Sequence, residues 1–250
     1  MIRGMRVLVV GASGAIGSAV IRRLSAEQAV IGAHYYQRPA LLERYAKRQR
    51  LTAKRFRLFQ AELSSQARCH ALVDAFVAWA GGIDAMVQLS GDIARPCSWE
   101  ELREPEWLAD LNVNLSGPFF LVQRAMARMK ASGGRIILTS TASAQHGGGA
   151  TSMAYGVAKA GIECLAKGFA REGAPHGIHV NVVAPGLIAS AFHTARMKRT
   201  PEQLARRAGL VPLKRAGMPD EVARLILFLL SSGGDYITGE RIAVSGGDWL

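Results

Sequence analysis

Apolar positions along the chain follow two different periods, which alternate from one end of the sequence to the other. Short runs rich in aliphatic and β-branched residues are typical of buried strands, and longer segments repeat their apolar residues every three or four positions, as one face of a helix does. The predicted strands are residues 5–10, 29–35, 55–59, 83–89, 135–139, 178–184 and 241–245. The predicted helices are residues 15–26, 39–50, 66–80, 107–130, 152–173 and 219–231.

Strands that alternate with helices predict a parallel sheet, because a chain that returns to the same end of a sheet needs a long crossing segment. Right-handed crossovers place these helices on both faces. The sequence therefore predicts an α/β fold, a single-domain doubly wound parallel sheet of Rossmann type with helices on both faces. No linker, repeat or low-complexity tract divides residues 1–250, so we expect one domain.

A glycine-rich segment, VVGASGAIGSAV, joins the first predicted strand to the first predicted helix. Its glycines allow a tight turn and the close approach of a pyrophosphate, and the start of the helix offers unpaired N–H groups to phosphates. We therefore expect a dinucleotide here; the alternative is a strand-to-helix turn without a ligand. The loop residues expected to bind are Gly11, Ser13, Gly14, Ala15, Ile16 and Gly17.

The end of the second predicted strand distinguishes between the two nicotinamide dinucleotides. In NAD-binding sites an Asp or Glu usually stands here and hydrogen-bonds the ribose 2′-hydroxyl. Tyr35 occupies this place and Arg38 follows, so no carboxylate repels a 2′-phosphate and an arginine is available to pair with it. The sequence therefore favours NADP(H) over NAD(H), the alternative being that Arg38 only begins the next helix.

A tyrosine and a lysine lie four residues apart in the segment MAYGVAK. Positions i and i+4 share one face of a helix, so Tyr155 and Lys159 would project side by side. We expect the ammonium, together with the positive nicotinamide ring of an oxidised cofactor, to lower the pKa of Tyr155 from its ordinary value of about 10. Such a tyrosine would be the general acid in the reduction of a ketone. In the alternative interpretation the tyrosine packs in the core and the lysine reaches water.

Several motifs in this order resemble the short-chain dehydrogenase/reductase family over essentially the whole chain, and most of all its 3-oxoacyl-(acyl-carrier-protein) reductases. They are the glycine loop, AELS, NVNLSG, RIILTSTAS, YGVAKAG, NVVAPGLIAS and YITGERIAVSGG. The resemblance implies catalysis by Asn114, Tyr155 and Lys159, with Lys159 also holding the nicotinamide ribose and Asn114 a water that relays protons. It implies further cofactor contacts at Glu62, Leu63, Ser90, Gly91, Pro185, Gly186, Ile188 and Ser190.

Three residues depart from the pattern of that family. Glu62 stands where Asp is usual, Leu89 where an asparagine is usual, and Val10 replaces threonine at the start of the glycine motif. The presence of Leu89 in place of the usual asparagine is expected to change either the stability of the sheet or the affinity for the cofactor.

The catalytic hydroxyl of the family is the fourth departure. Counting from Arg135 selects Thr141, whereas counting back from Tyr155 leaves Ser140 and Ser143 open. A threonine hydroxyl donates the same hydrogen bond as serine, so we expect Thr141 or Ser140 to bind the substrate carbonyl.

The segment 187–216, which the resemblance makes the substrate lid, is strongly basic. We expect it to attract an acyl thioester on CoA or on an acyl carrier protein, unless its charges only face solvent. His193 is expected to line this lid or lie on its surface rather than to act as a catalyst. The lid carries Arg196, Lys198, Arg199, Arg206, Arg207, Lys214 and Arg215 against Glu202.

We therefore expect an NADP-dependent reductase of a 3-oxoacyl thioester, as in fatty acid biosynthesis, and the resemblance implies a homotetramer. The alternatives are a reductase or dehydrogenase of a polyketide, sugar or steroid, a non-catalytic NADP-binding regulator suggested by Leu89 and Thr141, and a nucleic-acid binder suggested only by the formal charge of +12. No nucleic-acid-binding motif supports the last of these. We expect neither a metal nor a membrane partner, and three cysteines without a close pair suit the cytoplasm.

Overall fold

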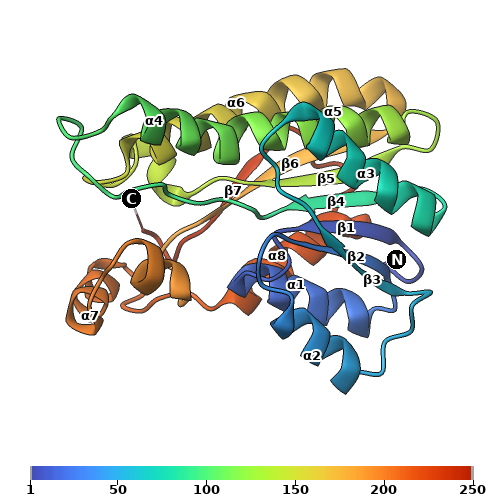
Figure 1. Ribbon diagram of the computed structural model, residues 1–250, viewed down its shortest axis with the longest axis horizontal. Helices are drawn as coiled ribbons and strands as arrows, with labels where there is room; N and C mark the ends of the chain where they lie inside the picture. Colours follow the sequence, from blue (N-terminus) through green and yellow to red (C-terminus); the bar gives the residue numbers. More distant parts are fainter. Residues whose placement is uncertain (1, 249–250) are drawn as a thin grey trace.

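The computed structural model describes residues 2–248 and confirms the predicted α/β class. One parallel sheet has the strand order β3-β2-β1-β4-β5-β6-β7 (Figure 1). The order reverses between β1 and β4, and a crevice at the carboxyl ends of the strands is expected at such a point. The strands are β1 (Arg6–Val10), β2 (Val30–Tyr35), β3 (Phe56–Gln60), β4 (Ala85–Gln88), β5 (Gly134–Thr139), β6 (Ile178–Pro185) and β7 (Arg241–Val244).

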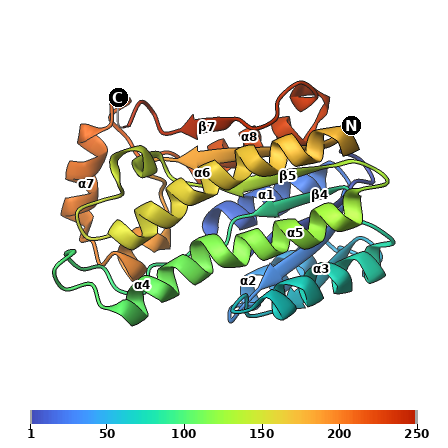
Figure 2. The same cartoon turned by 90° about the horizontal axis from the view of Figure 1, so that it is seen from above.

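Helices cover both faces of the sheet, as the alternating pattern predicts (Figure 2). One face packs against α1 (Ala15–Ala26), α2 (Ala40–Arg48) and α8 (Pro219–Leu230). The other face packs against α3 (Gln66–Ala80), α5 (Gly117–Met129) and α6 (Met153–Gly173). Because both faces are covered, the central strands are buried and read as continuous apolar runs.

The predicted helix over residues 107–130 is wrong in two respects. The helix α4 (Glu104–Leu111) begins earlier, because Glu106 accepts a hydrogen bond from the Arg103 N–H at 3.0 Å and Pro105 occupies the first turn. A π-helical turn, Asn112–Ser116, then separates α4 from α5. Such turns insert an extra residue and frequently mark functional sites.

The segment 187–216 contains a helix that the sequence pattern did not predict, α7 (Pro201–Leu210). Its start is a capping box in which the Thr200 hydroxyl accepts from the Gln203 N–H at 3.3 Å and the Gln203 side chain accepts from the Thr200 N–H at 3.0 Å. Figure 1 shows α7 beyond the end of the sheet, next to the carboxyl ends of the strands. None of the helices within residues 2–248 is long and apolar enough to cross a membrane.

An aromatic cluster fixes α3 on the sheet. The buried ring of Phe76 lies 6.0 Å from the ring of Phe59 and 5.9 Å from that of Trp79, measured between centroids. A Cβ on Gly32 of β2 would lie only 2.4 Å from the Phe76 ring, so the ring occupies the place that a side chain would take. The packing between α3 and the sheet therefore depends on this glycine and this phenylalanine together.

We expect Phe76→Ala to lower the free energy of unfolding by about 3–5 kcal/mol, because it removes a fully buried ring and leaves a cavity. Urea denaturation followed by circular dichroism measures the change. Tyr236→Ala is the control, since that side chain is fully exposed, and it should change stability by less than about 0.5 kcal/mol. Similar losses in both variants would contradict the assigned packing.

Candidate active site

An open cavity of about 750 Å³ lies at the carboxyl edge of the sheet. It brings together the glycine loop after β1, the residues that follow β5, the first turns of α6 and the lid segment after β6. Many of the candidate residues that the sequence predicts lie in these segments, and the fold joins those in one cavity. Within residues 2–248 no group of three His, Cys, Asp or Glu side chains is placed to share a metal ion.

The glycine loop has the geometry of a phosphate cradle. Gly11 has a φ of 80°, and a Cβ there would lie 2.7 Å from the Ser90 nitrogen. A Cβ on Gly17 would lie 2.3 Å from the Gly11 oxygen, so the helix start packs too closely on the loop for any side chain. The N–H groups of Ala15 and Ile16 have no acceptor among the described residues. The loop therefore fits a dinucleotide, whose phosphates would accept from these free N–H groups.

His34 holds the loop in place, a role that sequence reasoning missed. Its Nδ1 accepts from the Gly11 N–H at 3.1 Å, and its Nε2 lies 3.1 Å from the Ala61 oxygen, so Nε2 carries the proton. Burial lowers the pKa of His34 to about 4 and keeps the ring neutral. This single ring connects the glycine loop, β2 and the segment after β3. In the sequence, the only indication of this role was the position of His34 within a predicted buried strand.

The preference for NADP(H) over NAD(H) was predicted from two residues, and only one of them lines the cavity. Arg38 lines the cavity, is exposed, and has no ion-pair partner within the described part of the chain. Tyr35 is half-buried and packs against the core next to α1. Arg38 is therefore free to meet a phosphate, whereas Tyr35 contributes mainly the absence of a carboxylate.

Tyr155 and Lys159 lie together in the first turns of α6. The Lys159 side chain is 2% exposed, and its Nζ donates to the Thr139 oxygen at 3.0 Å. That Nζ also lies 5.6 Å from the centroid of the Tyr155 ring. Both residues line the cavity, as the spacing in MAYGVAK predicts.

In the protein alone, the Lys159 ammonium does not give the expected lowering of the Tyr155 pKa. Burial, and after it the carboxylate of Asp110, raise the pKa of Tyr155. Burial also lowers the pKa of Lys159 to about 8. The sequence indicated a charged neighbour but not how completely both groups leave water, and desolvation acts against both charged forms. Tyr155 therefore stays protonated at neutral pH.

The three candidate hydroxyls after β5 point in different directions. The Thr141 Oγ1 lies 3.2 Å from the Ser143 Oγ and 3.5 Å from the Pro185 oxygen, on the wall of the cavity. The Ser140 side chain is 2% exposed and its hydroxyl lies 3.0 Å from the Lys159 oxygen, within the protein. Thr141 and Ser143 are thus available to a substrate, while Ser140 is engaged in supporting α6.

A partly buried ion pair supports this region, and sequence reasoning missed it. Glu163, one turn after Lys159, accepts from the Ser140 hydroxyl at 2.6 Å and from the Arg241 Nε of β7 at 2.9 Å. The Arg241 Nη2 also lies 3.4 Å from the oxygens of Thr141 and Ala142. The pair ties β5, α6 and β7 together directly behind the candidate hydroxyl. In the sequence, the only indication of this pair was the opposite charge of one Glu and one Arg that lie 78 positions apart.

Asn114 lies in the π-helical turn and is fully buried. Its Nδ2 donates to the backbone carbonyl oxygens of Asp92 at 2.7 Å and of Asp110 at 2.9 Å. Its Oδ1 accepts from the backbone N–H of Asp92 at 3.2 Å. A Cβ on Gly91 would lie 2.8 Å from this Oδ1 and 3.2 Å from the Lys159 Nζ. Asn114 therefore borders Lys159 while it fixes the loop after β4.

The other expected cofactor contacts divide into two groups. Those that line the cavity are Gly91, Pro185, Gly186, Ile188 and Ser190. Three lie away from its wall, namely Glu62, Leu63 and Ser90. Glu62 forms an exposed ion pair with Arg68, and the Ser90 hydroxyl accepts from the Gln88 side chain at 2.7 Å.

Leu89, where the family usually has an asparagine, lies on the cavity wall and packs against the core. Its N–H donates to the Val10 oxygen at 2.9 Å, so the pairing of β1 with β4 continues past the change. The replacement therefore leaves the backbone at this point of the sheet intact.

Two ion pairs hold the lid across the cavity. Arg196 lies 2.7 Å from Asp92 of the loop after β4, and Arg207 of α7 lies 2.6 Å from Asp248. Arg199 is half-buried and has no acidic partner among residues 2–248; burial and then the neighbouring Arg207 lower its pKa. Beside these charges Phe192 stacks near Tyr155, with the ring centroids 6.1 Å apart.

His193 of the lid lines the cavity, as expected of a lining residue. Its Nδ1 is buried without a hydrogen-bond partner in the described structure. Burial, and then Arg199 and Arg207, lower its pKa to about 4, so the ring is neutral.

Comparison with known proteins covers almost the whole chain. A family described as Enoyl-(Acyl carrier protein) reductase matches residues 11–248. The chain is 35% identical over 246 residues to Nodulation protein G of Rhizobium meliloti (strain 1021), which is 98% of this chain and 96% of that protein. It is 31% identical over 252 residues to a probable 2,4-dienoyl-CoA reductase of Bacillus subtilis (strain 168), covering 98% and 96%. It is 31% identical over 245 residues to a 3-oxoacyl-(acyl-carrier-protein) reductase of Staphylococcus aureus, covering 97% of each.

We expect Glu163→Gln to lower the free energy of unfolding by about 1.5–3 kcal/mol, because it leaves the Arg241 guanidinium largely buried without its carboxylate. A double-mutant cycle with Arg241→Met, measured by urea denaturation, should give a coupling of about 1–3 kcal/mol. The exposed pair of Glu62 with Arg68 is the matched control and should give less than about 1 kcal/mol. Equal coupling energies in the two cycles would show that the pair of Glu163 with Arg241 stabilises the fold no more than an exposed pair does.

Proposed function

Because the chain belongs to the short-chain dehydrogenase/reductase family of oxidoreductases, we propose that it reduces a ketone to a secondary alcohol with NADPH. The proposed substrate is a 3-oxoacyl group carried as a thioester on CoA or on an acyl carrier protein. The observation that carries this proposal is the convergence of Tyr155, Lys159 and Thr141 on one cavity with a glycine loop shaped for a dinucleotide.

The proposed chemistry assigns one task to each side chain. NADPH, when bound, supplies the hydride, and the residues of the chain handle the carbonyl oxygen. The Thr141 hydroxyl hydrogen-bonds that oxygen, with Ser143 beside it, and so polarises the carbonyl. Tyr155 donates its proton to the oxygen as negative charge develops there. The raised pKa of Tyr155 suits this direction, because the proton is present at neutral pH.

Lys159 stabilises the phenolate that Tyr155 becomes after it has given up its proton. Its ammonium already lies near the Tyr155 ring, and only the Thr139 oxygen accepts a hydrogen bond from it within residues 2–248. Two of its three N–H groups thus remain for the ribose hydroxyls of the cofactor. Asn114 keeps the neighbouring loop in place. Its expected role in holding a relay water remains a prediction.

The choice of NADPH rests on Arg38. An exposed guanidinium on the wall of the cavity, without an acidic partner in the described residues, pairs favourably with a 2′-phosphate. No carboxylate follows β2 to hold a free 2′-hydroxyl instead.

The choice of a thioester rests on the lid and on the names of relatives. Arg199 and Lys198 face the cavity and have no acidic partner in the described part of the chain, so the lid favours an anionic carrier arm. Phe192 offers an apolar surface to the acyl chain beside Tyr155. The similar proteins include a probable 2,4-dienoyl-CoA reductase and a 3-oxoacyl-(acyl-carrier-protein) reductase. Assembly as a homotetramer through α5 and α6 remains a prediction, which sedimentation would test.

Oxidation of NADPH with acetoacetyl-CoA, followed at 340 nm, tests the proposal. We expect turnover by the wild type with NADPH, slower turnover with NADH, and a loss of about 10²–10⁴-fold in kcat for Tyr155→Phe. Fluorescence titration with NADPH should give the same Kd for both proteins, because the variant lacks only a hydroxyl. Tight NADPH binding without wild-type turnover would refute the thioester assignment, and a panel of small ketones would then separate another reductase from a regulator.

The pH dependence of reduction should follow Lys159. Its pKa of about 8 means that the ammonium is present below this pH and lost above it, while Tyr155 keeps its proton throughout. We therefore expect kcat/KM to be level up to about pH 8 and to fall above it. Lys159→Arg, which stays charged, should be slower but lack the alkaline fall, because arginine does not titrate in this range. An unchanged alkaline limb in that variant would assign it to another group.

A further inference from the structure

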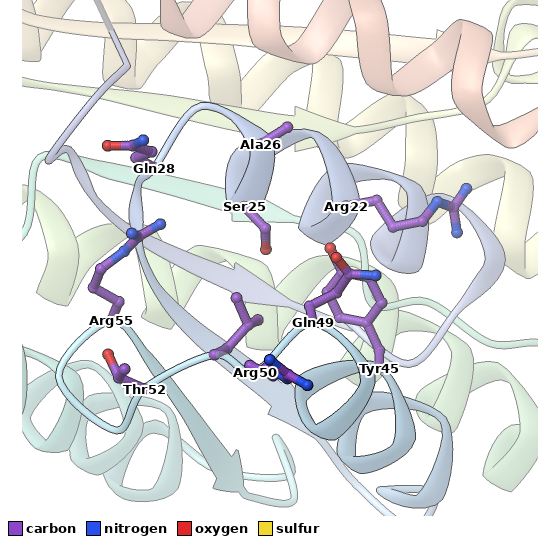
Figure 3. A pocket seen from close by; sticks show the side chains of 10 residues that line it. Arg22, Ser25, Ala26, Gln28, Tyr45, Gln49, Arg50, Thr52 and Arg55 are labelled. Carbon is purple, nitrogen blue, oxygen red and sulfur yellow. The ribbon is translucent and has the colours of Figure 1, made fainter.

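A second cavity lies at the opposite end of α1 from the glycine loop. Its volume is about 350 Å³. The last turns of α1 and α2 and the segment before β3 enclose it, as Figure 3 shows. The proposed reaction uses none of its residues, and the lid does not reach it.

The charge of this cavity is positive and uncompensated. Arg22, Arg50 and Arg55 line it, and no acidic side chain does. None of the three forms an ion pair within residues 2–248, whereas Arg23, also in α1, is paired with Asp220. The ends of α1 and α2 bring partial negative charge to this place, but three guanidinium groups exceed it. Such an arrangement favours an anion.

Two buried polar atoms on facing walls have no partner. The Ser25 hydroxyl of α1 and the Arg55 Nε before β3 are both inaccessible and make no hydrogen bond in the described structure. Figure 3 shows the Ser25 side chain directed from α1 toward α2, between Arg55 and Tyr45. Buried donors are almost always satisfied, so each unsatisfied one points to an acceptor that the chain does not supply.

The ends of α1 and α2 place two further side chains at the cavity. Gln28 after α1 has a φ of 60° and Arg50 after α2 has a φ of 52°, and both residues line the cavity. This left-handed conformation commonly ends a helix, and the Ala29 N–H donates to the Leu24 oxygen at 3.0 Å as the Leu51 N–H does to the Ala46 oxygen. The way both helices end therefore brings Gln28 and Arg50 to the cavity.

We propose that this cavity binds a small phosphate-bearing anion, either free phosphate or a phosphate monoester. The phosphate oxygens accept hydrogen bonds from the Arg55 Nε and the Ser25 hydroxyl, and Arg50 and Arg22 neutralise the remaining charge. A guanidinium provides the planar pair of donors that phosphate prefers. The volume of about 350 Å³ leaves room for the organic part of an ester beside the Tyr45 ring.

Isothermal titration calorimetry of the protein saturated with NADPH tests this site, because the bound dinucleotide blocks the glycine loop. The probes are inorganic phosphate and glycerol 3-phosphate, with ionic strength held constant by sodium chloride. We expect one saturable site per chain. Tighter binding of the ester by tenfold or more assigns the site to a phosphorylated metabolite, and equal or weaker binding assigns it to the free anion.

Three variants make the assignment specific. Arg55→Met and Ser25→Ala should each weaken phosphate binding by tenfold or more. Arg48→Met is the matched control, because Arg48 lies in α2 and carries the same charge but does not line the cavity, and it should change the affinity less than twofold.

Thermal unfolding without phosphate separates binding from mere structural support. Ser25→Ala should leave the Tm unchanged or raise it, because the variant removes a buried hydroxyl that has no partner. Phosphate should then raise the Tm of the wild type and of Arg48→Met but not that of Ser25→Ala. Absence of a saturable site in the wild type would mean that water fills the cavity. That result, or equal weakening by Arg48→Met, would overturn the proposal.

Discussion

The buried ammonium of Lys159 is the constraint on which the candidate site depends. It is 2% exposed and has no carboxylate partner in the described chain, so its charge relies on the Thr139 oxygen and on the face of the Tyr155 ring. A charge held in this way costs stability, and burial lowers its pKa to about 8 as a result. The contacts that position β5 against α6 therefore also determine how strongly this ammonium stabilises negative charge on the Tyr155 oxygen.

The surrounding structure is organised to support that arrangement. The pair of Glu163 with Arg241 lies behind the candidate hydroxyl and binds the ends of β5 and β7 to α6. Asn114 fixes the loop after β4 on the other side of Lys159. His34 performs the equivalent task for the glycine loop as a neutral ring. Buried polar contacts between distant segments, rather than the apolar core alone, thus determine where the cofactor loop and the proton donor meet.

The excess positive charge of +12 is distributed unevenly over the fold. Many arginines are neutralised locally, as Arg124 and Arg128 are by Asp74. Those without acidic partners in the described residues include Arg38 and Arg199 at the large cavity and the three arginines at the small one. These arginines lie where the proposed anionic ligands would bind.

The order of the helices and strands could be predicted from the sequence pattern, as could the segments that form the candidate site. Periods of two and of three to four residues marked the sheet and its covering helices, since burial on both faces of the sheet leaves long apolar runs. The glycine spacing and the four-residue step from Tyr155 to Lys159 are local geometry, so they too were readable. The predicted helix ends held at α1 and α3, and failed at α4, where Glu106 caps the helix early.

The properties that depend on contacts between distant segments became visible only in the folded chain. The direction of the Tyr155 pKa follows from its burial beside Phe192 of the lid and from the carboxylate of Asp110, which no local pattern reports. The Ser140 hydroxyl is engaged by Glu163, and this contact leaves Thr141 and Ser143 for the proposed contact with the substrate. Hydrogen bonds and desolvation depend on distance in space, whereas the sequence records only distance along the chain.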